Sequence, residues 1–497
     1  MISLKTHVFR VCCMLTLAFS AGTQATVGQP GTLDSTFGSA GRASTVIGSG
    51  SSSAMAIALQ PDGKLVLAGG CFGTSTTDIC ALRYNTNGTL DTSFGSGGKI
   101  IAVIAASVDA SPSVAVQSDG RIVLAGHCDG VSNLDFCALR YNANGTPDTS
   151  FGSGGKVITP MFGGNDSVRA VALQPDGKIV LAGYCFNGLV DFAFCALRYN
   201  ADGTPDAGFG SGGKTRNAMG FGSASATALV VQPDGKLVLA GSCIGAINTD
   251  FCALRYNVDG SLDTGFGSGG KVITAIGTGA DRATAIALQP DGKLVLAGTC
   301  IGASDPDFCA LRYHANGTLD ASFGTGGSVV SSLSSFDNGN AILLQPDGKL
   351  ILAGTCPFIS NGFCALRYHG NGAVDTSFGS NGRFIPDIGD GGSGNAAVLQ
   401  PDGKLVLAGS CLNGSDQHFC AARYDGGPFG YKACSLDLDG DGRILATTDS
   451  LIHARIALGI TGSAVVNGIT FPVEAKRKTW ASIRDYLVTQ CGMSLVP

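Results

Sequence analysis

Short apolar segments alternate with glycine-rich turns along most of the chain, and residues 155–200 show the pattern clearly. Its four segments are GKVITP (155–160), VRAVALQ (168–174), KIVLAGYC (178–185) and CALRYN (195–200). Their apolar positions recur with a period of two, as in strands with a buried face, and the segments are too short for helices. Pro175-Asp176-Gly177 predicts a tight turn in which Gly supplies a positive φ. The pattern predicts four antiparallel strands in one unit.

This unit recurs seven times. The Asp of PDGKLVLAG and its variants returns every 55 to 58 residues, together with the blocks LDxxFG and CALRYN. The recurring aspartates are Asp62, Asp119, Asp176, Asp234, Asp291, Asp347 and Asp402. Four short antiparallel strands repeated in this way are typical of propeller blades. We expect an all-β fold, a seven-bladed β-propeller of four-stranded antiparallel blades over residues 26–425, with an open solenoid as the alternative.

The two ends of the repeat array complement each other. The seventh repeat ends at Tyr424-Asp425 without an LDxxFG block, whereas an unpartnered copy at 33–38 precedes the first strand. We expect residues 33–38 to dock on blade seven and close the ring, since an open array would carry atypical capping repeats at both ends.

Composition and charge exclude several classes of protein. Of 497 residues, 75 are Gly and only 14% are charged, and the net charge of −5 gives no sign of a nucleic-acid partner. No stretch after the N-terminus reaches the ~18 apolar residues of a membrane helix, so we expect no transmembrane segment. Residues 1–25 predict a signal peptide, with Lys5 and Arg10 before a short apolar run and small residues up to Ala25. A buried N-terminal helix is the alternative.

Cysteines outside this leader recur as local pairs. The pairs are Cys71/Cys80, Cys128/Cys137, Cys185/Cys195, Cys243/Cys252, Cys300/Cys309, Cys356/Cys364 and Cys411/Cys420, and Cys434 and Cys491 remain. An even number in recurring pairs behind a signal peptide predicts disulfides in an oxidising compartment. Zinc is the alternative, but it prefers closer Cys spacing and His partners. We expect a Cys434–Cys491 bridge to join the ends of a C-terminal module.

The three recurring blocks together resemble the delta-60 repeat family, a bacterial β-propeller repeat. LDxxFGxxGK, QPDGKLVLAG and ALRYNxDG, or close variants, occur seven times over 33–425. The resemblance implies an exported propeller with no established catalytic role. We expect a secreted, periplasmic or cell-surface bacterial protein.

An Arg recurs in every ALRYN block, and an Asp follows it about eight residues later. The arginines are Arg83, Arg140, Arg198, Arg255, Arg312, Arg367 and Arg423. A charge repeated identically in every blade predicts a structural Arg–Asp pair at the inter-blade turn rather than a catalytic group. The Phe of LDxxFG, such as Phe94 or Phe151, is expected to fill the gap between blades.

Two sets of loops vary between repeats, and ligand specificity is expected there. One set lies between the paired cysteines and the other joins the first two strands of the unit. Examples of the first set are 72–79, 129–136, 186–194 and 412–419, and of the second 105–112, 161–166 and 220–225. Both sets are small, polar and Gly/Ser-rich, with no evident aromatic cluster or basic patch.

After a linker at 426–433, residues 434–497 show helical periodicity, with helices expected at 448–458 and 479–490. Between them and the ring lies the pattern D-x-D-x-D-G, whose hard oxygen ligands suit Ca²⁺. The expected metal ligands are Asp437, Asp439, Asp441, the backbone carbonyl of Arg443, and Asp449. The loop resembles the calcium loop of dockerins and EF-hands, but position 12 is Thr448 and there is one copy. An Asp-rich turn is the alternative.

No catalytic constellation is visible in the sequence. The His residues after the leader, His127, His314, His369, His418 and His453, fall at unrelated repeat positions. We expect a non-catalytic binding or surface-interaction protein for an envelope, glycan or protein ligand, with a calcium-stabilised C-terminal module. A secreted propeller hydrolase or lyase acting on polysaccharide is the alternative, and it predicts pKa-shifted acids or His lining one mouth of the ring. A purely structural extracellular component is the third hypothesis.

Overall fold

The computed structural model describes most of residues 29–489. The residues outside the description are 1–28, 73–76, 103–109, 131–132, 187–190, 303–304, 358–360, 385–390, 428–437, 439–447, 449–450, 453–454, 456–461, 473–474 and 490–497. The predicted signal peptide, the five predicted calcium ligands and the predicted Cys434–Cys491 bridge lie outside the described residues.

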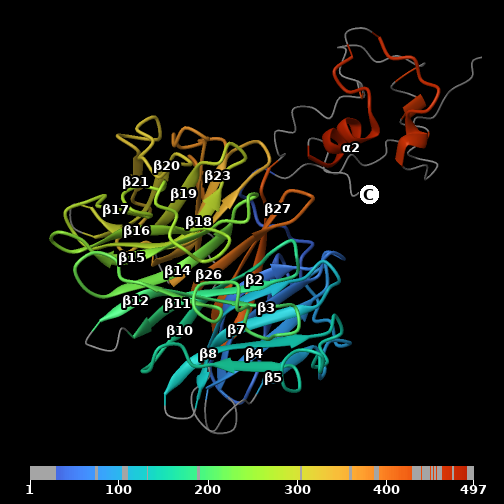
Figure 1. Cartoon of the computed structure of the whole chain (residues 1–497). Coiled ribbons are helices and arrows are strands. Elements are labelled where there is room, and N and C mark those ends of the chain that lie inside the picture. Colours follow the sequence, from blue (N-terminus) through green and yellow to red (C-terminus); the bar gives the residue numbers. More distant parts are fainter. Residues whose placement is uncertain are drawn as a thin grey trace, which may run out of the picture.

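Seven four-stranded antiparallel sheets form a closed ring, which confirms the expected seven-bladed β-propeller (Figure 1). Blades 1 to 4 are, from the inner to the outer strand, β2 (Ser52–Leu59), β3 (Leu65–Phe72), β4 (Thr77–Tyr84), β5 (Lys99–Ala102); β6 (Ala110–Val116), β7 (Ile122–Asp129), β8 (Leu134–Tyr141), β9 (Lys156–Thr159); β10 (Ser167–Leu173), β11 (Ile179–Phe186), β12 (Phe192–Tyr199), β13 (Lys214–Asn217); and β14 (Ala224–Val231), β15 (Leu237–Ile244), β16 (Thr249–Tyr256), β17 (Lys271–Thr274). Blades 5 to 7 are β18 (Asp281–Leu288), β19 (Leu294–Ile301), β20 (Pro306–Tyr313), β21 (Ser328–Ser331); β22 (Asn338–Leu344), β23 (Leu350–Pro357), β24 (Asn361–Tyr368), β25 (Arg383–Phe384); and β26 (Gly392–Leu399), β27 (Lys404–Asn413), β28 (Asp416–Asp425), β1 (Arg42–Thr45). The first strand of each blade contacts those of both neighbouring blades, so these seven strands surround the axis.

The blade boundary differs from the predicted unit by one strand. The segment at 155–160 was expected to be the first strand of a repeat, but β9 pairs with β8 and is the outer strand of the preceding blade. The glycine-rich turn after β8 returns the chain antiparallel to that strand, and only the following loop carries it to the axis. A repeat period alone does not fix where a unit begins, which is why this assignment was wrong.

The ring closes through both ends of the array. The predicted staple at 33–38 docks as expected, since the Asp34 amide donates to the Arg423 carbonyl at 2.8 Å and Leu33 bridges to Tyr424. Closure extends further than predicted, because β1 supplies the outer strand of blade 7 by pairing with β28. The closing segment is therefore residues 33–45.

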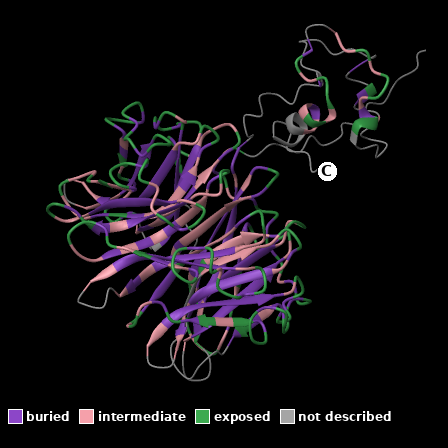
Figure 2. Ribbon diagram, in the orientation of Figure 1, coloured by how far each residue is buried: buried purple, intermediate pink, exposed green. Residues whose placement is uncertain are grey.

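Each hydrophobic cluster of the ring lies between two blades. Leu181 of β11 packs with Val123 and Ala125 of blade 2, whereas its neighbour Val180 packs with Leu239 of blade 4. The middle strands are thus buried on both faces, as Figure 2 shows. This explains why KIVLAG-type runs are nearly continuously apolar instead of strictly alternating.

A bulge on the inner strands links neighbouring blades. Where the register with the second strand shifts, the bulged side chain donates to a carbonyl of the next inner strand. These bonds are Thr227 to Ala283 (2.7 Å), Thr284 to Gly339 (2.6 Å), Asn340 to Gly394 (2.7 Å) and Asn395 to Ala54 (2.8 Å). The same position in blade 3 holds Arg169, whose long side chain is exposed.

Six of the predicted disulfides are present, each joining the second and third strands of a blade. They are Cys71–Cys80, Cys128–Cys137, Cys185–Cys195, Cys243–Cys252, Cys356–Cys364 and Cys411–Cys420. The predicted Cys300–Cys309 bond is not formed, although both buried cysteines occupy the equivalent register. Burial and contact with Cys300 raise the pKa of the Cys309 thiol, which disfavours the thiolate that disulfide exchange requires.

The described C-terminal residues form a small helical cluster. They include η1 (Gly462–Val465) and α2 (Trp480–Thr489), which confirms the helix expected at 479–490. Leu438, which lies inside the predicted calcium loop, is buried against Ile452, Val465 and Ile483. Within the described chain, no helix is long and apolar enough to cross a membrane.

Candidate functional site

The seven recurring arginines act as clasps between blades, as predicted. In each blade the Arg Nε donates to an Asp carboxylate at 2.7–2.9 Å, and its Nη1 donates to a backbone carbonyl of the next blade. The guanidinium also lies over the Phe of LDxxFG, 4.5–4.8 Å from the ring centroid. Those Phe side chains are fully buried, which confirms that they fill the gaps between blades.

A second cation supports each clasp Asp. The Lys64 ammonium lies 2.9 Å from Asp91, and Lys404 lies 2.5 Å from Asp34. Burial alone would raise the pKa of Asp91, but hydrogen bonds from Ser93 and Lys64 and the charge of Arg83 lower it well below its ordinary value. The clasp carboxylates are therefore ionised structural groups, already saturated with partners.

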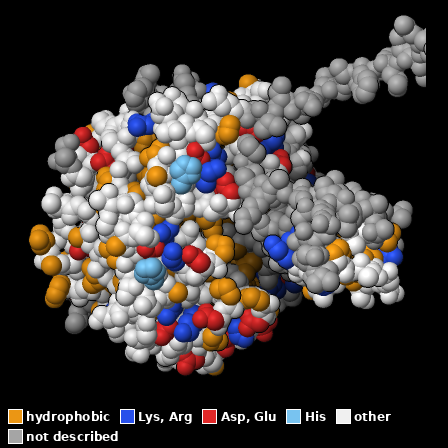
Figure 3. All heavy atoms as spheres, turned by 90° about the horizontal axis from the view of Figure 1, so that it is seen from above, with side chains coloured by type: hydrophobic (Ala, Val, Ile, Leu, Met, Phe, Trp, Pro, Cys, Tyr) orange, Lys and Arg blue, Asp and Glu red, His pale blue; other side chains and the backbone are white. Residues whose placement is uncertain are grey.

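The clasps and the PDG turns share one face of the ring. The turn between the first and second strands (174–178 in blade 3) and the turn between the third and fourth (200–213) define this turn face. Both turns are repeated almost unchanged, and Gly177 adopts the positive φ that the tight turn requires. In the view of Figure 3, acidic and basic side chains lie beside one another in small groups. Charges neutralised in pairs leave little for a ligand to recognise.

Both sets of variable loops lie on the opposite face. In an antiparallel blade, the loop between the second and third strands leaves the same end as the loop from the fourth strand to the next blade. Residues 245–248 and 218–223 show this around blade 4, and the Phe221 amide donates to the Ile244 carbonyl at 3.1 Å. We call this surface, made of the two loop sets, the variable face.

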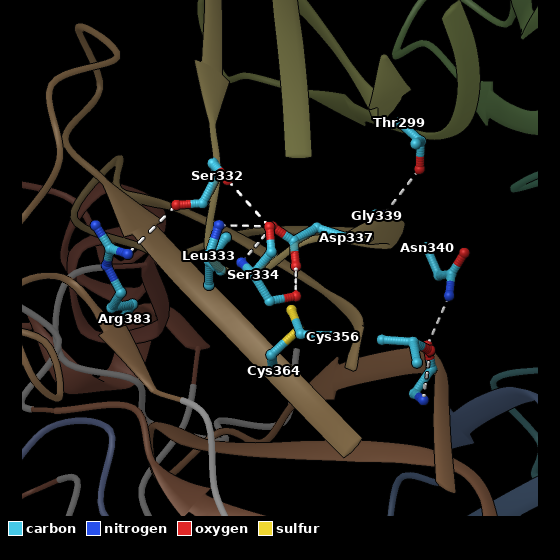
Figure 4. The surroundings of a disulfide bond; sticks show 12 residues. Thr299, Ser332, Leu333, Ser334, Asp337, Gly339, Asn340, Cys356, Cys364 and Arg383 are labelled. Atoms are coloured by element: carbon cyan, nitrogen blue, oxygen red, sulfur yellow. Dashed lines mark hydrogen bonds between the residues drawn. A yellow bond between two sulfur atoms is a disulfide. The ribbon is translucent and has the colours of Figure 1, made fainter. Parts of the chain in front are cut away.

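Buried acids hold the variable loops. Asp337, which ends the loop before β22, accepts the amides of Leu333 (2.5 Å) and Ser334 (2.9 Å) beside the Cys356–Cys364 disulfide (Figure 4). Asp281 of blade 5 accepts the amides of Ile276 and Gly277 in the same way. By accepting these backbone hydrogen bonds, each carboxylate stabilises the loop that precedes its inner strand.

A second acid lies beneath some of these loops, two residues before the second Cys of the blade. Burial raises the pKa of Asp250, and the nearby Asp281 charge raises it further. Burial likewise raises the pKa of Asp166 to about 6, with a contribution from Asp135. A Cβ on Gly245 would lie 1.8 Å from Asp250 Oδ2, so Gly is required where the Asp is present. Blades with this Asp have a Gly two residues after the first Cys, and blades 3, 6 and 7 have neither.

A pocket of about 440 Å³ opens on the variable face between blades 3, 4 and 5. We call it the mouth pocket, and its lining residues are Arg169, Tyr184, Phe192, Ser223, Ala224, Ser225, Thr227, Ser242, Thr249, Arg282, Ala283 and Thr284. They come from the variable-face ends of the strands of these blades. None of the pKa-shifted acids is among them.

Arginine and aromatic side chains meet on one wall of the mouth pocket. Arg169 Nη2 donates to Tyr184 Oη at 3.3 Å, and the Arg169 guanidinium lies 5.5 Å from the centre of the Tyr184 ring. Tyr184 contacts Phe192 edge to face, with ring centroids 5.1 Å apart. The half-buried rings leave polar and apolar surface side by side.

His127 lies near this wall on β7 but is not among the lining residues. Its Nδ1 is 3.0 Å from Ser167 Oγ. Burial, together with the charge of Arg169, lowers the pKa of His127 to about 4. The imidazole is therefore neutral at physiological pH, and it supports the residues beside the mouth pocket through its contact with Ser167.

Exposed apolar side chains border the mouth pocket. Phe221 is 85% exposed and Ile247 is 92% exposed, the two highest values among the large hydrophobic residues described. Both extend from variable loops of blade 4, next to the lining residues Ser223 and Thr249. Their exposure costs solvation free energy, which is typical of contact surfaces.

The sequence placed ligand specificity in the variable loops but missed this pocket. An aromatic and basic cluster does form on this face, but mainly from strand residues outside the two loop sets: Arg169, Tyr184 and Phe192 of blade 3 and Arg282 of blade 5. Aligning the repeats at the inner-strand bulge would have revealed one member, since Arg169 stands where blades 4 to 7 carry Thr or Asn.

No group of three or more His, Cys, Asp or Glu side chains suited to a metal occurs among the residues that the structure describes. The predicted ligands of the C-terminal loop are not among them, so calcium binding stays a prediction. At Leu438, a described residue of that loop, Arg477 Nε donates to the backbone carbonyl at 2.9 Å.

A family model described as a domain of unknown function (DUF5122) β-propeller matches six segments of the chain. The matched residues are 60–94, 117–151, 174–209, 232–266, 289–323 and 345–378. Each match starts before a PDG turn and ends at the Phe of LDxxFG. The same elements of the seventh repeat are divided between 400–425 and 33–37, at opposite ends of the array. The chain thus carries β-propeller repeats of this model, and the delta-60 name stays a prediction.

Solved propellers resemble the fold at low sequence identity. A protein from Lactobacillus plantarum is 15% identical, with a TM-score of 0.46, and covers 72% of this chain and 98% of that chain. A catalytically inactive virginiamycin B lyase from Staphylococcus aureus, with quinupristin, is 12% identical, with a TM-score of 0.44 and coverage of 77% and 98%. Sqt1 from Chaetomium thermophilum is 10% identical, with a TM-score of 0.37 and coverage of 76% and 97%. Among curated proteins none matches the chain. No function is transferred from these similarities.

Proposed function

We propose that this protein is an exported, non-catalytic binding protein that contacts a glycan or protein of the cell envelope through its variable face. The observation that carries the proposal is that the two faces of the ring differ in their conservation between blades and in how far their side chains are already paired. Repeated charges on the turn face are consumed in clasps, whereas the variable face differs between blades and carries exposed Phe221, exposed Ile247 and the mouth pocket. The six disulfides support an oxidising, extracytoplasmic location.

A binding role accounts for the shifted acids better than the alternative polysaccharide lyase or hydrolase. The acids with raised pKa lie beneath the loops and pack the blades, and the lining of the mouth pocket holds none of them. A catalytic acid or base would have to reach the bound ligand.

The C-terminal module is proposed to bind Ca²⁺ through the ligands named from the sequence. Calcium would fix the loop around Leu438, which already packs in the helical core. Thermal unfolding of the module with Ca²⁺ and with chelator, in the wild type and in Asp441→Ala, tests this. Identical melting in all four samples would contradict it.

Adsorption of the mature, oxidised protein to cell envelopes of the producing bacterium tests the proposed function. A Phe221→Ser/Ile247→Ser variant is expected to lose most of the adsorption at unchanged melting temperature. Val258→Ser, which alters a 51% exposed apolar residue on the turn face, is the matched control and should adsorb normally. Equal adsorption by both variants, or release of polysaccharide fragments by the wild type, would refute the proposal.

A further inference from the structure

We propose that the mouth pocket binds an anionic sugar unit, a uronate or a sulfated sugar, of an acidic polysaccharide. This inference rests on the proposed function and names the ligand class of the same face. It follows from the charge, the hydrogen-bonding capacity and the shape of the pocket.

The pocket is positively charged although the chain is acidic overall. Two guanidinium groups, those of Arg169 and Arg282, contribute to the lining, and no Asp or Glu does, whereas the formal net charge is −5. Asp191, which is not a lining residue, accepts a hydrogen bond from the hydroxyl of Ser223 at 3.3 Å. The two arginines therefore set the local potential that a ligand meets.

Among the described residues, Arg282 has its hydrogen-bonding capacity free for a ligand. Within the part of the chain that the structure describes, its exposed guanidinium makes no ion pair or hydrogen bond, in contrast to the seven saturated clasp arginines. Arg169 engages Tyr184 through one nitrogen only. A planar guanidinium donates two parallel hydrogen bonds to a carboxylate or sulfate, so an oxyanion is the group that this pocket recognises best.

The remaining lining suits a sugar ring. Tyr184 and Phe192 present aromatic surface against which the C–H face of a pyranose packs, and the hydroxyl-bearing residues Ser225, Ser242 and Thr249 line the same pocket. The volume of about 440 Å³ lies in the usual range of roughly 300–1,000 Å³ for small-ligand sites. The pocket is also open, as a site for one unit of a longer polymer must be.

An acidic peptide fits less well. Peptides often bind by adding a strand to a free sheet edge. Here bulge side chains occupy carbonyls of the inner strands at the pocket, as Thr227 does with Ala283 and Thr284 does with Gly339. Backbone pairing by a peptide would have to displace these bonds, whereas a sugar needs only the side chains.

Calorimetric titration of the oxidised protein tests the inference with four probes: alginate, carboxyl-reduced alginate, dextran sulfate and unmodified dextran. Alginate or dextran sulfate, or both, should bind, which also distinguishes carboxylate from sulfate, and each neutral counterpart should bind far more weakly. Arg282→Ala and Arg169→Ala should each weaken binding about tenfold or more, the effect of losing a charged hydrogen bond. The affinity of Arg282→Lys should lie between those of the wild type and Arg282→Ala, because Lys keeps the positive charge but loses the planar guanidinium that donates two parallel hydrogen bonds.

Lys156→Ala is the matched control, since it removes an exposed cation from the outer strand β9 and should leave affinity within about twofold. Equal binding of acidic and neutral polymers, or unchanged affinity in Arg282→Ala, would overturn the inference. If the envelope is bound through Phe221 and Ile247 while no acidic polymer binds, the proposed function stands and the ligand class is wrong. If the protein binds neither the envelope nor any acidic polymer, both the proposed function and the proposed ligand class are wrong.

Discussion

The clasp that closes the ring offers the sharpest test of how the propeller is held together. Arg423 pairs with Asp34 at 2.7 Å although 389 residues separate them, and it donates to the Thr86 carbonyl of blade 1 at 2.6 Å. Arg255 makes the same contacts with Asp263 at 2.7 Å and with Ala315, but its Asp lies only eight residues away. The two arginines thus share these contacts and differ in topology, and Arg423 makes one further hydrogen bond, from Nη2 to Thr36 Oγ1 at 3.1 Å.

The contacts that Arg423 makes determine how much free energy of unfolding the Arg423→Ala variant should lose. The substitution removes a charge-assisted bond to Asp34, the bond to blade 1 and a cation–π contact 4.8 Å from the Phe37 ring. Losing one partner of a buried ion pair costs about 3–5 kcal/mol. Lys404 still pairs with Asp34 at 2.5 Å, so we expect the lower end, about 3 kcal/mol.

Urea unfolding followed by circular dichroism measures that loss, and limited proteolysis measures ring opening. Arg255→Ala should lose a similar free energy of unfolding, because Lys236 likewise remains 2.8 Å from its Asp263. Only Arg423→Ala should accelerate tryptic cleavage after Arg42, since only that clasp holds the closing segment. Unchanged stability in both variants, or equal cleavage rates, would refute the clasp account.

Three further outcomes are expected. Gly245→Ala should destabilise the protein by about 1–3 kcal/mol through overpacking against Asp250, and adding Asp250→Ala should recover most of the loss in urea unfolding. Asp250→Asn should raise the melting temperature at pH 7 and not at pH 3. The folded-state pKa of Asp250 is raised, so its stabilising contribution is present below about pH 4 and is lost as the pH rises through that pKa. A higher melting temperature of the variant at pH 3 alone would contradict this. Under non-reducing conditions, alkylation mapped by mass spectrometry should label Cys300 and Cys309 only after denaturation, and no labelling at either position would show that the seventh disulfide forms after all.

The architecture was predictable because identical blocks recur at a constant spacing. Six copies of Arg and Asp eight residues apart indicated a structural pair, and the unpartnered copy at 33–38 indicated how the ring closes. The extent of closure was not predictable, because the repeat period does not show that β1 is the outer strand of blade 7.

The mouth pocket could not be read from the sequence for a different reason. Its residues are single departures from the repeat, such as Arg169 at an inner-strand bulge and Tyr184 near a strand end, scattered over more than one blade. Each looks like neutral variation until the blades are placed side by side. The buried acids were missed likewise, since Asp250 and Asp281 lie in separate repeats and meet only across a blade interface.

Hydrogen exchange of the protein, free and bound to an isolated envelope polysaccharide fraction, tests the central claim most directly. The account predicts slower amide exchange on binding in variable-face segments 218–227, 242–249 and 280–284, with no change in turn-face segments 200–213 and 257–270. Protection confined to the turn face, or spread equally over both faces, would contradict the assignment of the variable face as the binding surface.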